Sequence, residues 1–151
     1  MNPSDPNVTF AHTDPIDDWY ERMYRHVSGF HAGKRRTKIY LHGPCGIPGL
    51  SFNYGVGQFD CFAELFIKPT THASSKSVFD NLHTHRDVVG KAFGSVLAWD
   101  RMEGKEACRI RYTIQKGYQS PREEWPEIQA ALIDAMHLLE KALHPFLREL
   151  G

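Results

Sequence analysis

The chain has 151 residues, of which 18 are basic and 18 acidic, so its formal net charge is zero. Hydrophobic residues make up 41% and charged residues 24%, a composition typical of a domain that buries a core and not of a disordered chain. Zero net charge excludes a global attraction to nucleic acid or to an anionic membrane, so any such binding requires a local patch. No apolar run approaches the length of about 18 residues that a membrane span needs.

The start of the chain and its cysteines indicate a cellular location. Residues 1–13 are polar, contain proline and lack the apolar run of a signal peptide. The three cysteines, Cys45, Cys61 and Cys108, are odd in number and form no Cys-x-x-Cys pair, so we interpret them as buried apolar residues. We expect a flexible segment at 1–13, a single folded domain at 14–151 and a cytoplasmic location.

The first helix is predicted to start at Asp14 and Pro15, because aspartate caps helix starts and proline suits the first helical position. Apolar side chains then recur at helical spacing and should form one buried stripe, made up of Ile16, Trp19, Tyr20, Met23 and Val27.

A basic turn is predicted at 33–38, after which the apolar period changes from helical spacing to every second residue. This alternation predicts three strands, at 38–42, 50–56 and 59–67. Because glycine-containing turns join these strands in sequence, they favour an antiparallel meander.

A second helix is predicted at 78–93, ending at Gly94, which suits the left-handed cap of a helix. Alternation then returns at 96–102 and 107–114. These two strands should form a hairpin.

The last helix has the strongest local signal. Residues 120–123 read Ser-Pro-Arg-Glu, a capping box with proline in the first turn, and apolar residues follow at every third or fourth position. Pro145 should kink or end the helix. The predicted fold class is α+β, with helices packed on a mostly antiparallel five-stranded sheet in the order α-β-β-β-α-β-β-α.

Motifs for phosphate, cofactor or metal binding are weak. The glycine-rich stretch 43–49 contains two prolines, which remove backbone donors, and no Gly-Lys-Ser/Thr sequence follows it. His83 and His85 are two positions apart and would point in different directions on a helix, which disfavours a shared metal ion. We expect no catalytic residue, no metal site and no cofactor.

A nuclease of the restriction-endonuclease-like fold is the enzymatic alternative, because a helix, a three-stranded meander and a second helix also begin that fold. Such enzymes need an acid on the second strand and an Asp/Glu-x-Lys sequence on the third, so that the metal, the carboxylates and the lysine converge on the phosphate. Here Lys68 stands four positions after Glu64, and the second strand has no acid. The pattern disfavours a divergent metal-dependent nuclease but leaves it open.

A local basic surface is the strongest candidate for binding. Lys34, Arg35, Arg36 and Lys38 form a dense cluster, and Arg25 lies on the preceding helix. With tyrosines nearby in the sequence, these residues could grip a nucleic-acid backbone and present rings for base stacking. A solvated charged turn is the alternative interpretation. Binding through this surface should weaken sharply as salt is raised.

Glu64 and Arg109 form a candidate ion pair. Glu64 faces the same side of its strand as Phe62 and Phe66, while Arg109 and Arg111 share a face of the last strand. If the two strands are neighbours, Glu64 can pair with an arginine, and we favour a structural ion pair over a catalytic role.

Six segments together resemble a known family. They read GIPGLSF at 46–52, AELFI at 63–67, FDNL at 79–82, LAWDR at 97–101, ACRI at 107–110 and EWPE at 124–127. In their order and spacing, they resemble the prokaryotic family of domains of unknown function numbered 4268, from about Trp19 to the end of the last helix. Phe66 stands where that family commonly has tyrosine, and Lys68 where it commonly has aspartate. The resemblance implies an accessory role, because such domains commonly follow nuclease-like or restriction-associated regions.

We therefore expect a non-catalytic interaction module that binds protein or nucleic acid in a prokaryotic defence or DNA-transaction setting. Two alternatives remain: the divergent nuclease, and an inhibitor that acts on a defence enzyme through its surface. Another protein chain is the expected partner, nucleic acid and a second copy of this chain stay open, and no membrane partner is expected.

Overall fold

The computed structural model describes residues 15–27, 31–35, 38–44, 46–69 and 74–150, so the predicted flexible segment at 1–13 lies outside the described residues. The elements in chain order are α1 (Pro15–Tyr24), β1 (His31–Arg35), β2 (Lys38–Pro44), β3 (Leu50–Val56), β4 (Cys61–Ile67), α2 (Ser75–His83), α3 (Arg86–Phe93), β5 (Ala98–Asp100), β6 (Cys108–Ile114), the 3-10 turn η2 (Arg122–Glu124) and α4 (Trp125–Leu150).

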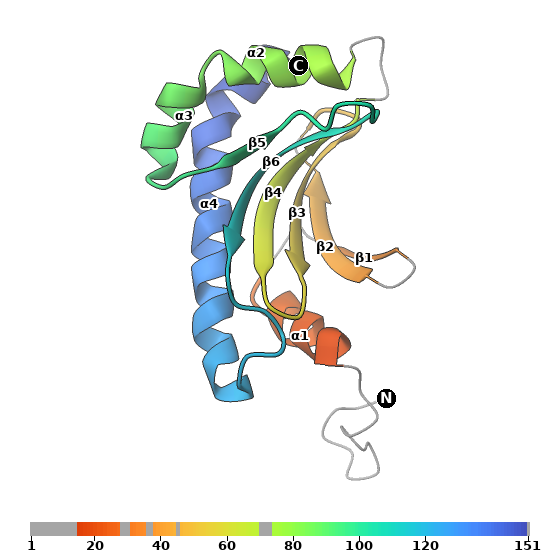
Figure 1. Ribbon diagram of the computed structural model, residues 1–151, viewed down its shortest axis with the longest axis vertical. Coiled ribbons are helices and arrows are strands. Elements are labelled where there is room, and N and C mark those ends of the chain that lie inside the picture. The colour runs from red at the N-terminus through yellow and green to blue at the C-terminus, as the bar shows by residue number, and fades with distance from the viewer. Residues whose placement is uncertain (1–14, 28–30, 36–37, 45, 70–73, 151) are drawn as a thin grey trace.

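The described strands form one antiparallel sheet in the spatial order β1-β2-β3-β4-β6-β5 (Figure 1). Four seven-residue strands, β2, β3, β4 and β6, make up its centre, and the shorter β1 and β5 lie at its edges. The α+β class agrees with the prediction, but the count of five strands is wrong.

The additional strand is β1, which occupies residues 31–35, where a basic turn was predicted at 33–38. Its sequence, His-Ala-Gly-Lys-Arg, has no alternating apolar residues, so the chain gives no periodic signal for it. An edge strand needs only one neighbour, and lysine and arginine on such a strand discourage pairing with a further chain.

The second predicted helix, at 78–93, is two helices, α2 and α3, and the predicted element order is wrong here as well. The Thr84 hydroxyl donates to the Asn81 carbonyl oxygen at 2.6 Å, and the His85 amide donates to the Leu82 carbonyl oxygen at 3.0 Å. A threonine hydroxyl that donates to a backbone carbonyl oxygen competes with the backbone hydrogen bonds of the helix for that acceptor. These contacts mark the end of α2 before α3 begins at Arg86.

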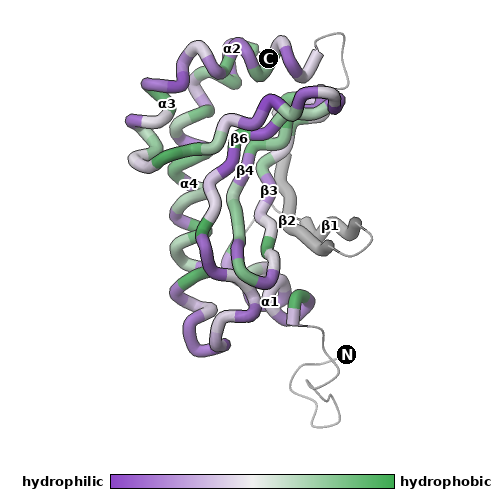
Figure 2. The backbone as a smooth tube through the Cα atoms, viewed as in Figure 1, coloured by the Kyte–Doolittle hydropathy of each residue, from purple (hydrophilic) through white to green (hydrophobic). Residues whose placement is uncertain are grey.

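The helices cover one face of the sheet. In Figure 1, α4 runs behind the strands, with α1 at one end of the sheet and α2 and α3 at the other. Alternate residues of the central strands face the helices and form the core, among them Phe52 and Tyr54 of β3 and Leu65 and Ile67 of β4. From α4, the core receives Leu132, Met136 and Leu139. Figure 2 shows hydrophobic and hydrophilic stretches recurring along α4, as expected of a helix with one apolar face.

The last helix extends further than its sequence indicates. Pro145 was expected to kink or end it, and of these two outcomes the end is wrong, because α4 continues through Pro145 to Leu150. Leu143 and Leu147, on either side of the proline, are both buried in the core, and this packing holds the last turns in helical form. In the described part of the chain, no helix has both the length and the apolar character that crossing a membrane requires.

The prediction of buried cysteines is confirmed for Cys61 and Cys108, which are free thiols with no exposed surface, whereas Cys45 lies outside the described residues. Burial, with a smaller effect of the Asp60 carboxylate, raises the pKa of Cys61 to about 12. The native state therefore retains a proton that the unfolded chain loses above about pH 9.

This difference in pKa makes a testable contribution to stability. Between about pH 8 and about pH 10, the free energy of unfolding should fall by about 1 kcal/mol on account of Cys61 alone, because the unfolded state binds fewer protons there. The measurement is urea denaturation of the wild type and of Cys61→Ala at both pH values. The fall in the free energy of unfolding between the two pH values should be about 1 kcal/mol smaller in Cys61→Ala than in the wild type. An equal fall in both proteins would contradict the prediction.

Candidate functional site

The predicted basic residues are divided between a helix end and an edge of the sheet. Arg25 follows α1 and is exposed. Lys34 and Arg35 are the last residues of β1, Lys38 is the first of β2, and the register pairs Arg35 with Lys38. Arg36 lies outside the described residues. The four described positions therefore lie along one stretch of chain, from the end of α1 through the β1–β2 hairpin.

This stretch belongs to a longer segment without acidic residues. Between Glu21 and Asp60 there is no aspartate or glutamate, whereas six basic residues occur there, namely Arg22, Arg25, Lys34, Arg35, Arg36 and Lys38. The remainder has 18 − 6 = 12 basic and 18 acidic residues, a net charge of −6, so the zero total conceals a strong asymmetry. We call the end of α1 together with β1 and β2 the basic edge. Charge counted along the sequence reveals it, and the whole-chain sum hides it.

The face of the sheet away from α4 holds a buried ionic network. Glu64 of β4 is 5% exposed, and the register places it between Asn53 of β3 and Arg111 of β6. Arg111 Nε donates to Glu64 Oε1 at 2.9 Å, and Arg111 Nη2 donates to the same oxygen. Asn53 Nδ2 donates to Glu64 Oε2 at 3.1 Å. The carboxylate thus links β3, β4 and β6.

Arg109, which we expected to pair with Glu64, has a different partner. The register places Arg109 opposite Phe66, and its Nε donates to Asp100 Oδ2 at 3.0 Å. Alternation shows that Arg109 and Arg111 share a face, but only the strand register determines which of them meets Glu64.

Aromatic packing fixes the arginine of this network. The Arg111 guanidinium carbon lies 3.6 Å from the centroid of the Phe62 ring. The same ring rests against Gly55, where a Cβ would lie 2.0 Å from the ring atom Cζ. Asn53 Oδ1 is buried and has no hydrogen-bond partner among the described residues. Both Glu64 oxygens accept hydrogen bonds from other strands, so we assign this carboxylate a structural role.

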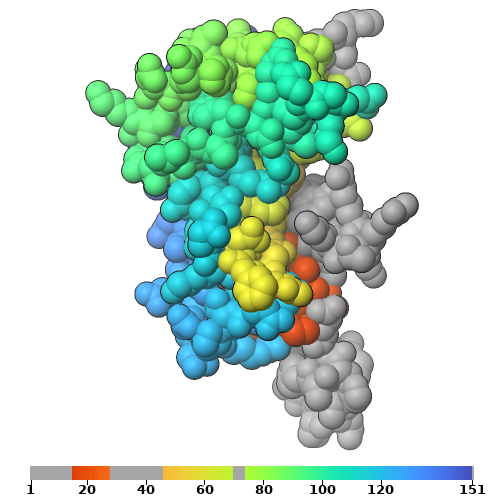
Figure 3. Space-filling model, in the orientation of Figure 1, coloured from red at the N-terminus to blue at the C-terminus, as the bar shows by residue number. Residues whose placement is uncertain are grey.

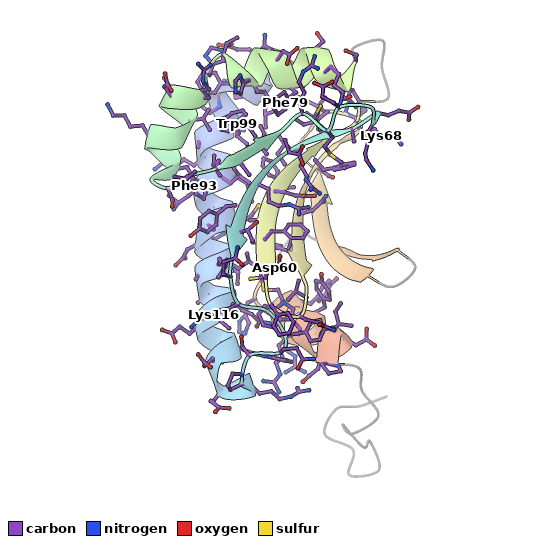
Figure 4. All side chains as sticks on the ribbon, viewed as in Figure 1. Asp60, Lys68, Phe79, Phe93, Trp99 and Lys116 are labelled. Atoms are coloured by element: carbon purple, nitrogen blue, oxygen red, sulfur yellow. The ribbon has the colours of Figure 1, made fainter. Side chains whose placement is uncertain are left out.

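His83 and His85, the two histidines weighed above as metal ligands, make separate aromatic contacts. Figure 4 shows Phe79 and Trp99 together at the end of the sheet beneath α2, with ring centroids 6.1 Å apart. The His83 ring packs on both, at 5.7 Å and 5.4 Å, whereas the His85 ring stacks on Phe146 at 4.1 Å. In the described part of the chain, no three histidine, cysteine or acidic side chains are grouped so that they could hold a metal ion.

Charged contacts near these rings fasten α2 to the β5–β6 hairpin. Lys76 Nζ donates to the carbonyl oxygens of Met102 at 2.8 Å, of Ala107 at 3.1 Å and of Arg101. The Arg101 guanidinium binds both oxygens of Asp80, at 2.9 Å and 3.0 Å, and this hydrogen bonding lowers the pKa of Asp80. We assign these groups a structural role.

A groove with a volume of about 400 Å³ lies between α1 and α4. Its α1 wall is cationic and its α4 wall is mainly apolar, with Arg22, Arg25 and His26 on one side and Pro126, Ala130 and Ile133 on the other. Sequence reasoning missed the groove, because its two walls come from segments about a hundred residues apart.

The walls of the groove are held together by buried contacts. Gln129 Nε2 donates to the Trp19 carbonyl oxygen at 2.9 Å, and the rings of Trp19 and Trp125 meet edge to face at 5.2 Å. Arg22 binds Asp18 at 3.3 Å, which partly compensates its charge. The guanidinium of Arg25 lies 3.8 Å from the Glu21 carboxylate, and because both side chains are exposed, this ion pair contributes little to stability.

Helices on one face of a six-stranded antiparallel sheet, with a basic edge beside them, define a small α+β domain. Comparison with protein families matches the chain over residues 18–147 to the family described as Domain of unknown function (DUF4268), and the chain belongs to that family. No curated protein and no solved structure matches the chain.

Proposed function

We propose that this domain is a non-catalytic interaction module that binds nucleic acid through the basic edge. We further propose that it works in the cytoplasm with another protein chain, in a prokaryotic defence or DNA-transaction system, the setting that the family resemblance implies. The observation that carries the proposal is the segment between Glu21 and Asp60, which has six basic residues and no acidic one.

The physical basis is local charge. Phosphate contacts from lysine and arginine release counterions, which favours binding whatever the total charge of the protein. Acidic residues elsewhere in the chain repel phosphates and so restrict binding to the basic edge. In Figure 1, β1 and β2 lie at the edge of the sheet remote from α4.

The metal-dependent nuclease remains the alternative with an enzymatic function. It would need Glu64 to bind a metal ion and Lys68 to face the same phosphate. Instead, Glu64 binds Arg111 and Asn53, and Lys68 Nζ lies 3.7 Å from Glu106 at the end of the sheet shown in Figure 4. A metal at Glu64 would have to displace Arg111. The other alternative, an inhibitor of a defence enzyme, would bind a protein and not a polyanion.

The proposed function is tested by titrating the protein into labelled single-stranded DNA, duplex DNA and RNA at several salt concentrations. If Arg25, Lys34, Arg35 and Lys38 each neutralise a phosphate of a single strand, a plot of log affinity against log salt should have a slope of about −3. This slope corresponds to a fall in affinity of about 50-fold between about 50 mM and about 200 mM salt.

The same samples, incubated with magnesium or manganese, separate binding from catalysis. We expect intact nucleic acid after prolonged incubation. Cleavage that disappears in a Glu64→Gln variant shown by circular dichroism to remain folded would establish the nuclease and overturn the proposal. The proposal would also be overturned if none of the three nucleic acids showed salt-dependent binding.

A further inference from the structure

We infer that the groove between α1 and α4 is a subsite for one unstacked nucleotide, with the base against the α4 wall and the phosphate at the α1 wall. This inference rests on the proposed function. It specifies where on the domain a single strand is bound by contacts to a base in addition to contacts with its phosphates.

The two walls match the two halves of a nucleotide. Pro126, Ala130 and Ile133 offer an apolar surface to the flat face of a base, and Arg22 and Arg25 line the other side of the groove. Asp134, also in the lining, can accept a hydrogen bond from an amino group at the edge of the base. A volume of about 400 Å³ lies within the range of small-ligand pockets.

Continuity with the basic edge favours a nucleotide over an acidic peptide. Arg22 and Arg25 begin the segment that has no acidic residue, and α1, which carries the cationic wall of the groove, lies in contact with β2. A single strand with one base in the groove could therefore continue along the cationic positions of β1 and β2. A groove of about 400 Å³ can hold one unstacked base, whereas a duplex keeps its bases stacked.

Adenosine monophosphate tests the groove directly, independently of any variant. We expect it to shift the methyl resonances of Ile133 and Ala130 in a saturable way. Adenosine, which lacks the phosphate, should shift the same methyl groups with weaker affinity, and inorganic phosphate alone should leave them unchanged. Methyl resonances that do not respond to the nucleotide, or that respond only to polyglutamate, would overturn the inference.

A pair of variants on one helix then tests the role of the groove in binding a strand. Ala130→Glu places a carboxylate between the two walls, whereas Ala131→Glu makes the same change one residue further along, at an exposed position outside the groove. Loss of one bound base should weaken binding of single-stranded DNA about tenfold in Ala130→Glu, with little change in Ala131→Glu. If the two variants bind with equal affinity and binding still depends on salt, the groove is not a nucleotide subsite, although the proposal that the basic edge binds nucleic acid is unaffected. No binding by the wild type would instead contradict the proposed function.

Discussion

Replacing Glu64 with alanine should lower the free energy of unfolding by about 3–5 kcal/mol, the typical cost of removing one partner from a buried ion pair. The side chain of Glu64 is 6% exposed and that of Arg111 22% exposed, so the variant leaves a largely buried guanidinium without its carboxylate. It also removes the acceptor of Asn53 Nδ2. Urea denaturation at neutral pH measures the loss.

Two further variants make the comparison specific. Glu106→Ala removes an exposed carboxylate whose distance from Lys68 is 3.7 Å, and it should change the free energy of unfolding by no more than about 0.5 kcal/mol. Replacing Asn53, Glu64 and Arg111 together by apolar residues of similar size should cost less than Glu64→Ala alone, because no charge is then left unpaired. Equal losses for Glu64→Ala and Glu106→Ala would show that the network does not stabilise the sheet.

The central elements of the fold were predictable because each has one apolar face. Alternation identified β3, β4 and β6, and helical spacing identified α1 and α4, since these elements meet the same core. The edge strand β1 has no residues patterned for the core, so its charged sequence was interpreted as a turn. The break between α2 and α3 depends on a local competition at Thr84, which apolar spacing does not report.

The candidate site was predictable only in part, for related reasons. Alternation placed Glu64 on a face with an arginine opposite, but the choice of Arg111 over Arg109 depends on register, which is a property of two strands together. The groove depends on contacts such as that between Gln129 and Trp19, 110 residues apart in the chain. The basic cluster, in contrast, is a local feature of the sequence, and its extent follows from the positions of the acidic residues on either side.

Replacing Lys34, Arg35 and Lys38 together by alanine should have the largest effect on nucleic-acid binding. Each lost phosphate contact forfeits the release of about 0.7 of a counterion from a single strand, so three contacts should reduce the salt slope by about 2. At about 0.1 M salt, this change corresponds to an affinity about 100-fold lower. Thermal unfolding of the variant checks that the domain remains folded.

A matched control separates the basic edge from total charge. Lys91 in α3 and Lys141 and Arg148 in α4 are exposed, and their replacement by alanine changes the net charge by the same three units. Figure 3 shows one face of the molecule that includes the region around α3 and part of α4. If binding depended on net charge alone, both triple variants would lose affinity equally.

The salt dependence of single-stranded DNA binding, measured side by side for the wild type and the two triple variants, tests the central claim most directly. We expect the slope to fall by about 2 in the variant of Lys34, Arg35 and Lys38 and to remain at the wild-type value in the variant of Lys91, Lys141 and Arg148. Equal slopes in all three proteins would show that the basic edge is not where nucleic acid binds.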